Sequence, residues 1–254
     1  MTEPHLSEVE KEFHIDPMHQ FEIHPIGGRL ELGGFDISFT NSALYMVIAA
    51  AVIILFLTIA MSRRALVPGR LQSVAEIFYE TIANMVRDNV GSAGRPYFPF
   101  IFTLFMFLLV GNLMGLLPGT FTFTSHIIVT FTMAAIIFVF VTILGFAIHG
   151  LHFLRIFFPH GAPGWTAVIL IPIELVSYLS RPISLSVRLF ANMTVGHVLL
   201  KVIGGFVILM GIAGILPLFF LVGITALEFL VAVLQAYVFT ILTCIYLNDA
   251  IHMH

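Results

Sequence analysis

The feature that most constrains the fold is an almost unbroken apolar stretch of about 80 residues, from Trp165 to about Leu247. A run of about 18 or more apolar residues is long enough to cross the hydrocarbon core of a bilayer as a helix. Hydrophobic residues make up 59% of the chain and charged residues 10%, whereas a soluble domain has about 45–50% and about 25%. The sequence therefore indicates an all-α membrane protein.

Five apolar segments are predicted to span the membrane within a single membrane domain, residues 41–254. The helix from Trp165 to about Lys201 would be about 55 Å long at 1.5 Å per residue. The hydrocarbon core is only about 30 Å thick, so the last two helices are expected to tilt strongly. Four short spans in place of these two are an alternative, but the sequence has no polar turns for them. The predicted spans are residues 42–61, 97–117, 126–149, 165–203 and 209–248.

Residues 71–90 are predicted to form an amphipathic helix that lies on the membrane surface. Their apolar and polar side chains recur at helical spacing on opposite faces, which is typical of interfacial helices. Packing against a soluble partner is the alternative. The apolar face consists of Leu71, Val74, Ile77, Phe78, Ile82, Met85 and Val86, and the polar face of Ser73, Glu76, Glu80, Asn84 and Arg87.

Residues 1–40 are predicted to form a polar tail outside the membrane. They show neither the basic start and apolar core of a signal peptide nor the arginines of a transit peptide. The spacing of the tail histidines does not repeat a helical face, so a metal site is not expected there. The single cysteine, Cys244, excludes a disulfide framework, and the net charge of −3 does not indicate a nucleic-acid partner. The tail histidines are His5, His14, His19 and His24.

The lysines and arginines are distributed unevenly between the two sides of the predicted membrane domain. Under the positive-inside rule, the side with more of them is cytoplasmic. This places the C-terminus in the cytoplasm and the N-terminus outside, in a multi-pass membrane protein. The cytoplasmic group is Arg63, Arg64, Arg70, Arg87, Arg95 and Arg155, and the outer group is Lys11, Arg29 and Lys201.

The segment SLSVRLFANMTVGH places Arg188 within the apolar region. A charge at the bilayer centre costs roughly 2.5–3.5 kcal/mol on insertion scales, so an ionisable residue there indicates function. At 100° per residue, polar residues before and after Arg188 fall on different faces of the helix. Two offset polar paths that meet near Arg188 are therefore expected, although helix packing is an alternative for the serines. The first path holds Glu174, Ser177, Arg181, Ser184, Arg188 and Asn192, and the second holds Thr194, His197 and Lys201.

The last predicted helix carries Glu228 and Gln235, seven residues apart and therefore on one face. A buried carboxyl group requires a proton or a partner, and His197 on the preceding helix is the expected partner. A carboxyl group beside an imidazole can relay a proton because histidine titrates near neutrality. Asn112 is a single amide in an apolar span and is included among the candidate proton-path residues, although packing between helices is the more common role of such an amide.

The motifs RLFANMTVGH, LQAYVFTILTCIYL and NLMGLLP resemble the F-type ATP synthase subunit a family, particularly its mitochondrial and alphaproteobacterial members. The resemblance covers nearly all of residues 40–250. It implies a proton-translocating membrane stator, which faces a rotating ring of small carboxylate-bearing subunits and also binds b-type peripheral-stalk subunits. A free-standing ion transporter or channel is the alternative, although the internal repeats common in transporters are not found.

The resemblance also implies roles for individual residues. Arg188 matches the arginine that faces the ring carboxylate and separates the two half-channels, and Asn192 and Gln235 match polar residues beside it. His197 and Glu228 match a pair in the outer half-channel, with acid and histidine exchanged relative to many bacterial members. Glu174 and Ser184 match positions toward the cytoplasmic half-channel. Gly115 stands where several bacterial members have an aspartate, so outer access must rely on other groups.

The chain is expected to be non-catalytic and to need no cofactor or metal, because enzyme motifs are missing from the sequence.

Overall fold

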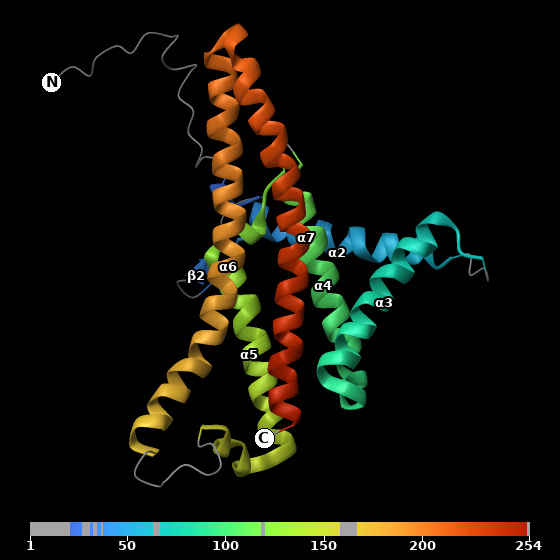
Figure 1. Cartoon of the computed structure of the whole chain (residues 1–254), viewed down its shortest axis with the longest axis vertical. Coiled ribbons are helices and arrows are strands. Elements are labelled where there is room, and N and C mark those ends of the chain that lie inside the picture. The colour runs from blue at the N-terminus through green and yellow to red at the C-terminus, as the bar shows by residue number, and fades with distance from the viewer. Residues whose placement is uncertain are drawn as a thin grey trace, which may run out of the picture.

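The computed structural model describes residues 21–26, 31–32, 35–36, 38–62, 67–117, 120–157 and 167–252. Helices dominate these ranges (Figure 1). The long α-helices are α2 (Asn41–Ala60), α3 (Arg70–Val90), α4 (Phe98–Gly115), α5 (Ile127–His149), α6 (Ala167–Leu209) and α7 (Ile215–Ile251). Short 3-10 helices connect them: η2 (Gly91–Tyr97), η3 (Phe123–Ser125), η4 (Gly150–Phe157) and η6 (Gly211–Gly214).

The described residues contain 5 helical segments that are long and apolar enough to cross a membrane. They are α2, the stretch Arg70–Gly115 whose apolar part is α4, the stretch Ile127–Leu154, and the two long helices α6 and α7. The all-α membrane fold predicted from the sequence is therefore confirmed. One difference lies before α2, where β1 (Glu31–Leu32) and β2 (Phe35–Asp36) form a two-stranded antiparallel pair within the predicted tail.

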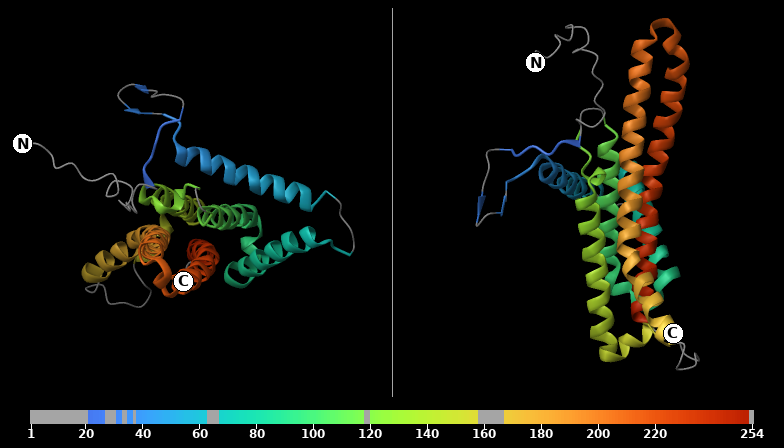
Figure 2. Two further views of the ribbon diagram at one scale, coloured as in Figure 1. Left: turned by 90° about the horizontal axis from the view of Figure 1, so that it is seen from above. Right: turned by 90° about the vertical axis from the view of Figure 1, so that its left-hand side faces the viewer.

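The two longest helices, α6 with 43 residues and α7 with 37, form an antiparallel hairpin. Figure 2 shows that the η6 end of this hairpin extends well beyond α4 and α5. The predicted end of α6 near residue 203 was too early, because the helix continues through two glycines to Leu209. The chain turns at η6, where Gly211 has a φ of 53° that favours glycine.

Helices α4 and α5 pack beside the lower half of the hairpin in Figure 1. The main apolar core lies where α3, α4, α5, α6 and α7 meet, and its fully buried members include Ile101, Leu108, Leu189 and Phe239. Two prolines, Pro172 and Pro182, lie inside α6. The lower part of α6 diverges from α7 in Figure 1, and proline is the usual cause of such bends.

Helix α2 crosses the direction of the long helices at a steep angle (Figures 1 and 2). Its 20 residues would extend about 30 Å, which equals the thickness of the hydrocarbon core. Its start is tied down, because the Thr40 hydroxyl accepts a hydrogen bond from the Ala43 N–H at 3.3 Å and caps the helix.

Helix α3 is amphipathic, as its sequence pattern predicted. The apolar face divides along its length: Ile82, Met85 and Val86 are buried against the rest of the protein, whereas Leu71 and Ile77 are more than half exposed. The C-terminal half of α3 is therefore part of the core, and the N-terminal half offers an apolar surface to its surroundings.

Candidate functional site

Helix α6 presents polar side chains on two different faces, as the sequence predicted. Ser184, Arg188 and Asn192 are exposed on the outer surface of the hairpin. Thr194 and His197 point inward, and the Thr194 hydroxyl donates a hydrogen bond to the Ser125 carbonyl at 3.2 Å. The change of face falls just after Arg188, between residues 192 and 194.

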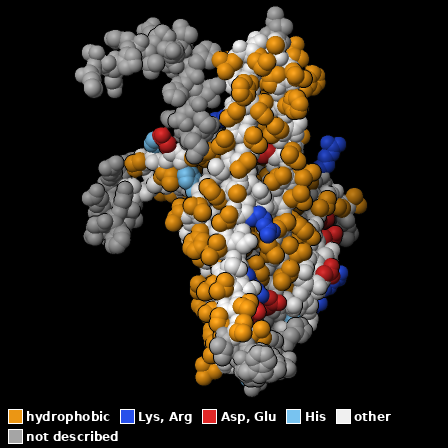
Figure 3. Space-filling model, turned by 60° about the vertical axis from the view of Figure 1, so that its left-hand side comes forward, with side chains coloured by type: hydrophobic (Ala, Val, Ile, Leu, Met, Phe, Trp, Pro, Cys, Tyr) orange, Lys and Arg blue, Asp and Glu red, His pale blue; other side chains and the backbone are white. Residues whose placement is uncertain are grey.

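Arg188 is exposed on an otherwise apolar surface. Its neighbours Ile183, Val187 and Val195 are 52%, 42% and 56% exposed. Figure 3 shows the hairpin face as a hydrophobic surface with isolated charged side chains. A guanidinium group in such a place requires an anionic partner, because an unpaired charge in an apolar environment is costly.

His197 lies at the centre of a buried polar cluster. Its Nδ1 is 3.7 Å from Glu228 Oε1 on α7, and its Nε2 is 3.1 Å from the Thr122 hydroxyl before η3. His197 and Glu228 are 8% and 5% exposed, so water does not screen the pair as it would at a surface. The partner that the sequence predicted for Glu228 is thus within ion-pair distance of it.

Thr122 is a member of this cluster that the sequence analysis missed. Its hydroxyl also donates to the Gly115 carbonyl at 3.2 Å. A Cβ at Gly115 would lie 2.6 Å from the Thr122 oxygen, so glycine at position 115 makes room for this threonine. The absence of a side chain at Gly115 was noticed in the sequence, but the residue that fills the space lies in a turn and follows no helical period.

Gly196 is packed equally closely against Glu228. A Cβ at Gly196 would lie 2.6 Å from Glu228 Oε1. Glu228 also lines a pocket of about 260 Å³ between α6 and α7. Glu228 therefore contacts His197 inside the protein and lines a pocket that opens between the two helices of the hairpin.

The two predicted amides beside the arginine contact each other across the hairpin. Asn192 Nδ2 donates to Gln235 Oε1 at 2.9 Å. Asn112, which is fully buried on α4, donates to the Ala232 carbonyl of α7 at 3.2 Å. This bond supports a packing role for Asn112, since Ala232 lies between Glu228 and Gln235 and the bond fixes α7 in position.

Glu174 and Ser184 remain separate from this cluster. Ser184 is exposed one turn before Arg188, and Glu174 is half-exposed, roughly 21 Å from Arg188 along the helix axis. Arg181, which the sequence placed on the same path, is instead paired: its Nη1 lies 2.8 Å from Asp249 Oδ2 on α7. Arg181 also lies over the rings of Tyr178 and Tyr246, at 5.4 and 5.0 Å.

A histidine at the start of α5 lies near the cluster. His126 stacks on Phe121 with ring centroids 5.1 Å apart. Phe21 meets the rings of both His126 and His197 edge-on, at 6.5 and 6.3 Å. Through Phe21, the segment before α2 thus packs against the His197 cluster.

Of the four tail histidines, the structure describes only His24. His24 is exposed with its Nε2 3.5 Å from Glu22 Oε2, whereas His5, His14 and His19 lie outside the described residues. Among the described side chains, no group of three or more His, Cys, Asp or Glu residues is arranged to hold a metal ion.

Comparison with known proteins gives a consistent result over the whole membrane domain. The family profile described as ATP synthase A chain matches residues 43–248. ATP synthase subunit a of Paramagnetospirillum magneticum is 64% identical over 94% of this chain and 99% of its own length. The protein of the same name from Rhodospirillum rubrum is 60% identical over 94% of this chain and 99% of its own length. That from Pelagibacter ubique is 53% identical over 94% of this chain and 98% of its own length. This agreement confirms the resemblance found in the sequence, and the chain belongs to the ATP synthase A chain family.

Proposed function

We propose that this chain is the non-catalytic, proton-translocating stator of an F-type ATP synthase, with two half-channels that meet at Arg188. The observation that carries the proposal is the change of polar face along α6, from the exposed Ser184, Arg188 and Asn192 to the inward Thr194 and His197. A continuous polar face would give an open pore. Two faces joined at a cation give two water-accessible paths that a proton cannot cross directly.

The exposed face of the α6–α7 hairpin is the proposed contact surface for the rotating ring of carboxylate-bearing subunits. Arg188 favours the ionised form of a carboxyl group that passes it, because opposite charges attract strongly in a poorly solvated site. The ring carboxylate therefore releases its proton to one half-channel and is reloaded from the other. The membrane potential supplies about 2.3 kcal/mol per proton for each 100 mV.

The outer half-channel is proposed to run through Thr122, His197 and Glu228. A hydroxyl group has one proton, so Thr122, when it donates to the Gly115 carbonyl, accepts from His197 Nε2–H. The other ring nitrogen, Nδ1, then faces the Glu228 carboxyl at 3.7 Å. A small movement would allow one proton to pass between these two groups. Glu174 and Ser184 are proposed to serve the cytoplasmic half-channel.

The placement of the protein follows from the same proposal. If α2 spans the bilayer close to its normal, the steep crossing in Figure 1 requires α6 and α7 to tilt strongly. The polar tail, residues 1–40, then lies outside a bacterial inner membrane. Helix α3 lies on the cytoplasmic side, and so does the C-terminus of the membrane domain that residues 41–254 form. The exposed apolar side chains of α2 contact lipid or the helices of b-type stalk subunits.

The central test is Arg188→Gln in the assembled complex, with Arg70→Gln as a matched control at the start of α3. We expect the Arg188 variant to assemble normally and to lose ATP-driven proton pumping into inverted vesicles, while the control pumps normally. Proton pumping by the Arg188 variant would contradict the proposal. Proton transport by the purified chain alone in vesicles, without a ring, would favour a free-standing transporter instead.

A further inference from the structure

We propose that the groove between α3, η2 and α4 is a binding site for an anionic phospholipid. In this site Arg95 binds the headgroup phosphate, Arg87 adds positive charge at the rim, and an acyl chain extends along Phe98 and Phe102. The site is separate from the proposed proton path, which lies on α6 and α7.

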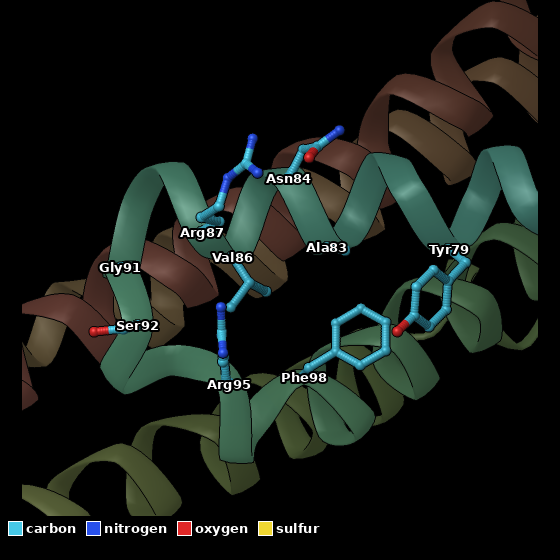
Figure 4. Close-up of a pocket in the computed structure, with 9 residues that line it drawn as sticks. All are labelled: Tyr79, Ala83, Asn84, Val86, Arg87, Gly91, Ser92, Arg95 and Phe98. Carbon is cyan, nitrogen blue, oxygen red and sulfur yellow. The ribbon is translucent and has the colours of Figure 1, made fainter.

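The polar end of the groove is a pocket of about 540 Å³ between α3 and the start of α4. Figure 4 shows the Arg95 side chain extending toward α3 and the rings of Tyr79 and Phe98 side by side at the other end of the pocket. Arg87 and Asn84 also line the pocket, and in Figure 4 their side chains point away from Arg95. The lining residues are Tyr79, Ala83, Asn84, Val86, Arg87, Gly91, Ser92, Arg95 and Phe98.

Two glycines hold Arg95 in place. Gly91 ends α3 with a φ of 76°, a conformation that favours glycine, so the chain reverses direction sharply. A Cβ at Gly94 would lie 2.8 Å from Val86 and from Val90, so only glycine allows η2 to pack this closely on α3. The backbone beside Arg95 is therefore fixed against the helix that carries Arg87.

The charges at this end favour an anion. Arg87 has its own sequence neighbour Asp88 at 3.7 Å, but both side chains are about 70% exposed, where such a pair contributes little. The Arg95 side chain forms no ion pair within the described part of the chain. Guanidinium groups bind phosphate through two parallel N–H donors, which makes arginine well suited to a phosphodiester.

The groove continues as an apolar pocket of about 320 Å³, which shares Tyr79 with the first. Its walls come from α2, α3 and α4: Leu57, Met61, Ala75, Glu76, Tyr79 and Phe102. Phe98, which lines the first pocket, connects the two: its ring centroid lies 4.8 Å from that of Tyr79, and the ring stacks on Phe102 at 5.7 Å. The carboxylate of Glu76 is held by Gln72 Nε2 at 2.8 Å.

A ligand that fits both pockets must be negatively charged at one end and apolar at the other. Free phosphate would use only the arginines, and an apolar helix of another subunit would use only the second pocket. Arg95 lies in η2, three residues before the start of the apolar helix α4, which is where a membrane interface is expected. Basic pockets between membrane helices on the cytoplasmic side bind anionic headgroups. An anionic phospholipid satisfies all of these conditions.

The test uses the assembled complex in vesicles of phosphatidylcholine that contain phosphatidylglycerol with a photoreactive diazirine on one acyl chain. We expect labelling of peptides that contain Leu57 or Phe102. Arg95→Gln should reduce it about fivefold, the equivalent of the roughly 1 kcal/mol that one basic residue contributes at an anionic membrane surface. Arg70→Gln is the matched control, because it removes an arginine from α3 that lines neither pocket.

Competing lipids separate the possible ligands. Unlabelled phosphatidylglycerol should displace the label, whereas phosphatidylcholine or inorganic phosphate should not. Equal labelling of the Arg95 and Arg70 variants would overturn the proposal, and so would displacement by inorganic phosphate. Absence of label, together with crosslinking of a photoreactive residue at Tyr79 to another subunit, would assign the groove to a protein partner. Proton pumping, measured on the same vesicles, reports on the proposed function independently.

Discussion

The imidazole of His197 lies 3.7 Å from the carboxyl group of Glu228, on two helices that the chain joins only through a distant turn. Burial of both side chains makes their protonation states depend on each other, so they should titrate as a pair.

An exchange of these two residues should show whether the pair functions as a unit. His197→Glu alone or Glu228→His alone places two like groups together, and each should slow proton translocation about 10²-fold, the lower range for a positioned acid or base. The double exchange should recover part of the rate, measured as ATP-driven pumping in vesicles. A double variant no faster than expected from the two single defects would contradict the pairing, provided all three variants assemble.

The absence of a side chain at Gly115 should be needed to hold the Thr122 hydroxyl in place. Gly115→Ala would bring a methyl group to 2.6 Å from that oxygen and displace it from His197. We expect slower proton uptake from the outer side in Gly115→Ala and in Thr122→Val. Thr132→Val is the control, because the Thr132 hydroxyl bonds only to its own helix at 2.6 Å. Equal rates in Thr122→Val and Thr132→Val would exclude Thr122 from the path.

The two faces of α6 should be reached by water from opposite sides of the membrane. Cysteine at position 174 or 184 should react with a membrane-impermeant thiol reagent from the cytoplasmic side, and cysteine at position 197 from the outer side. The chain's own cysteine, Cys244, is fully buried, so the unaltered protein is the control and should react little. Reaction of all three positions from one side would show a single continuous path.

The ion pair between Arg181 and Asp249 should stabilise the end of the hairpin opposite η6 rather than conduct protons. Both groups are partly exposed, at 23% and 34%, so their coupling is expected to be about 1 kcal/mol. Asp249→Asn should lower the temperature at which the detergent-solubilised complex dissociates, and Arg181→Gln in that background should lower it little further. Loss of pumping in an intact, stable Asp249→Asn complex would argue instead for a place in the proton path.

Much of this protein could be read from its sequence because membrane helices are encoded locally. The apolar runs correspond to α2, α4, α5, α6 and α7, since each helix satisfies its backbone hydrogen bonds within itself. The helical period also assigned His197 and Arg188 to different faces of α6. Helix ends were less predictable, and α6 passes its two adjacent glycines because glycine is tolerated within membrane helices.

Contacts between helices were decided only by the tertiary structure. Nothing in the local pattern indicates that Arg181 pairs with Asp249, 68 residues away, or that Thr122 fills the space at Gly115. Such contacts depend on how two helices approach and on which side chains fit between them, and that fit is a property of the packed core. The sequence by itself determined which segments are helical and where charges enter the membrane. The tertiary structure decided that His197 meets both Glu228 and Thr122, because only the packing of α6 against α7 and the α4–α5 connection brings the three side chains together.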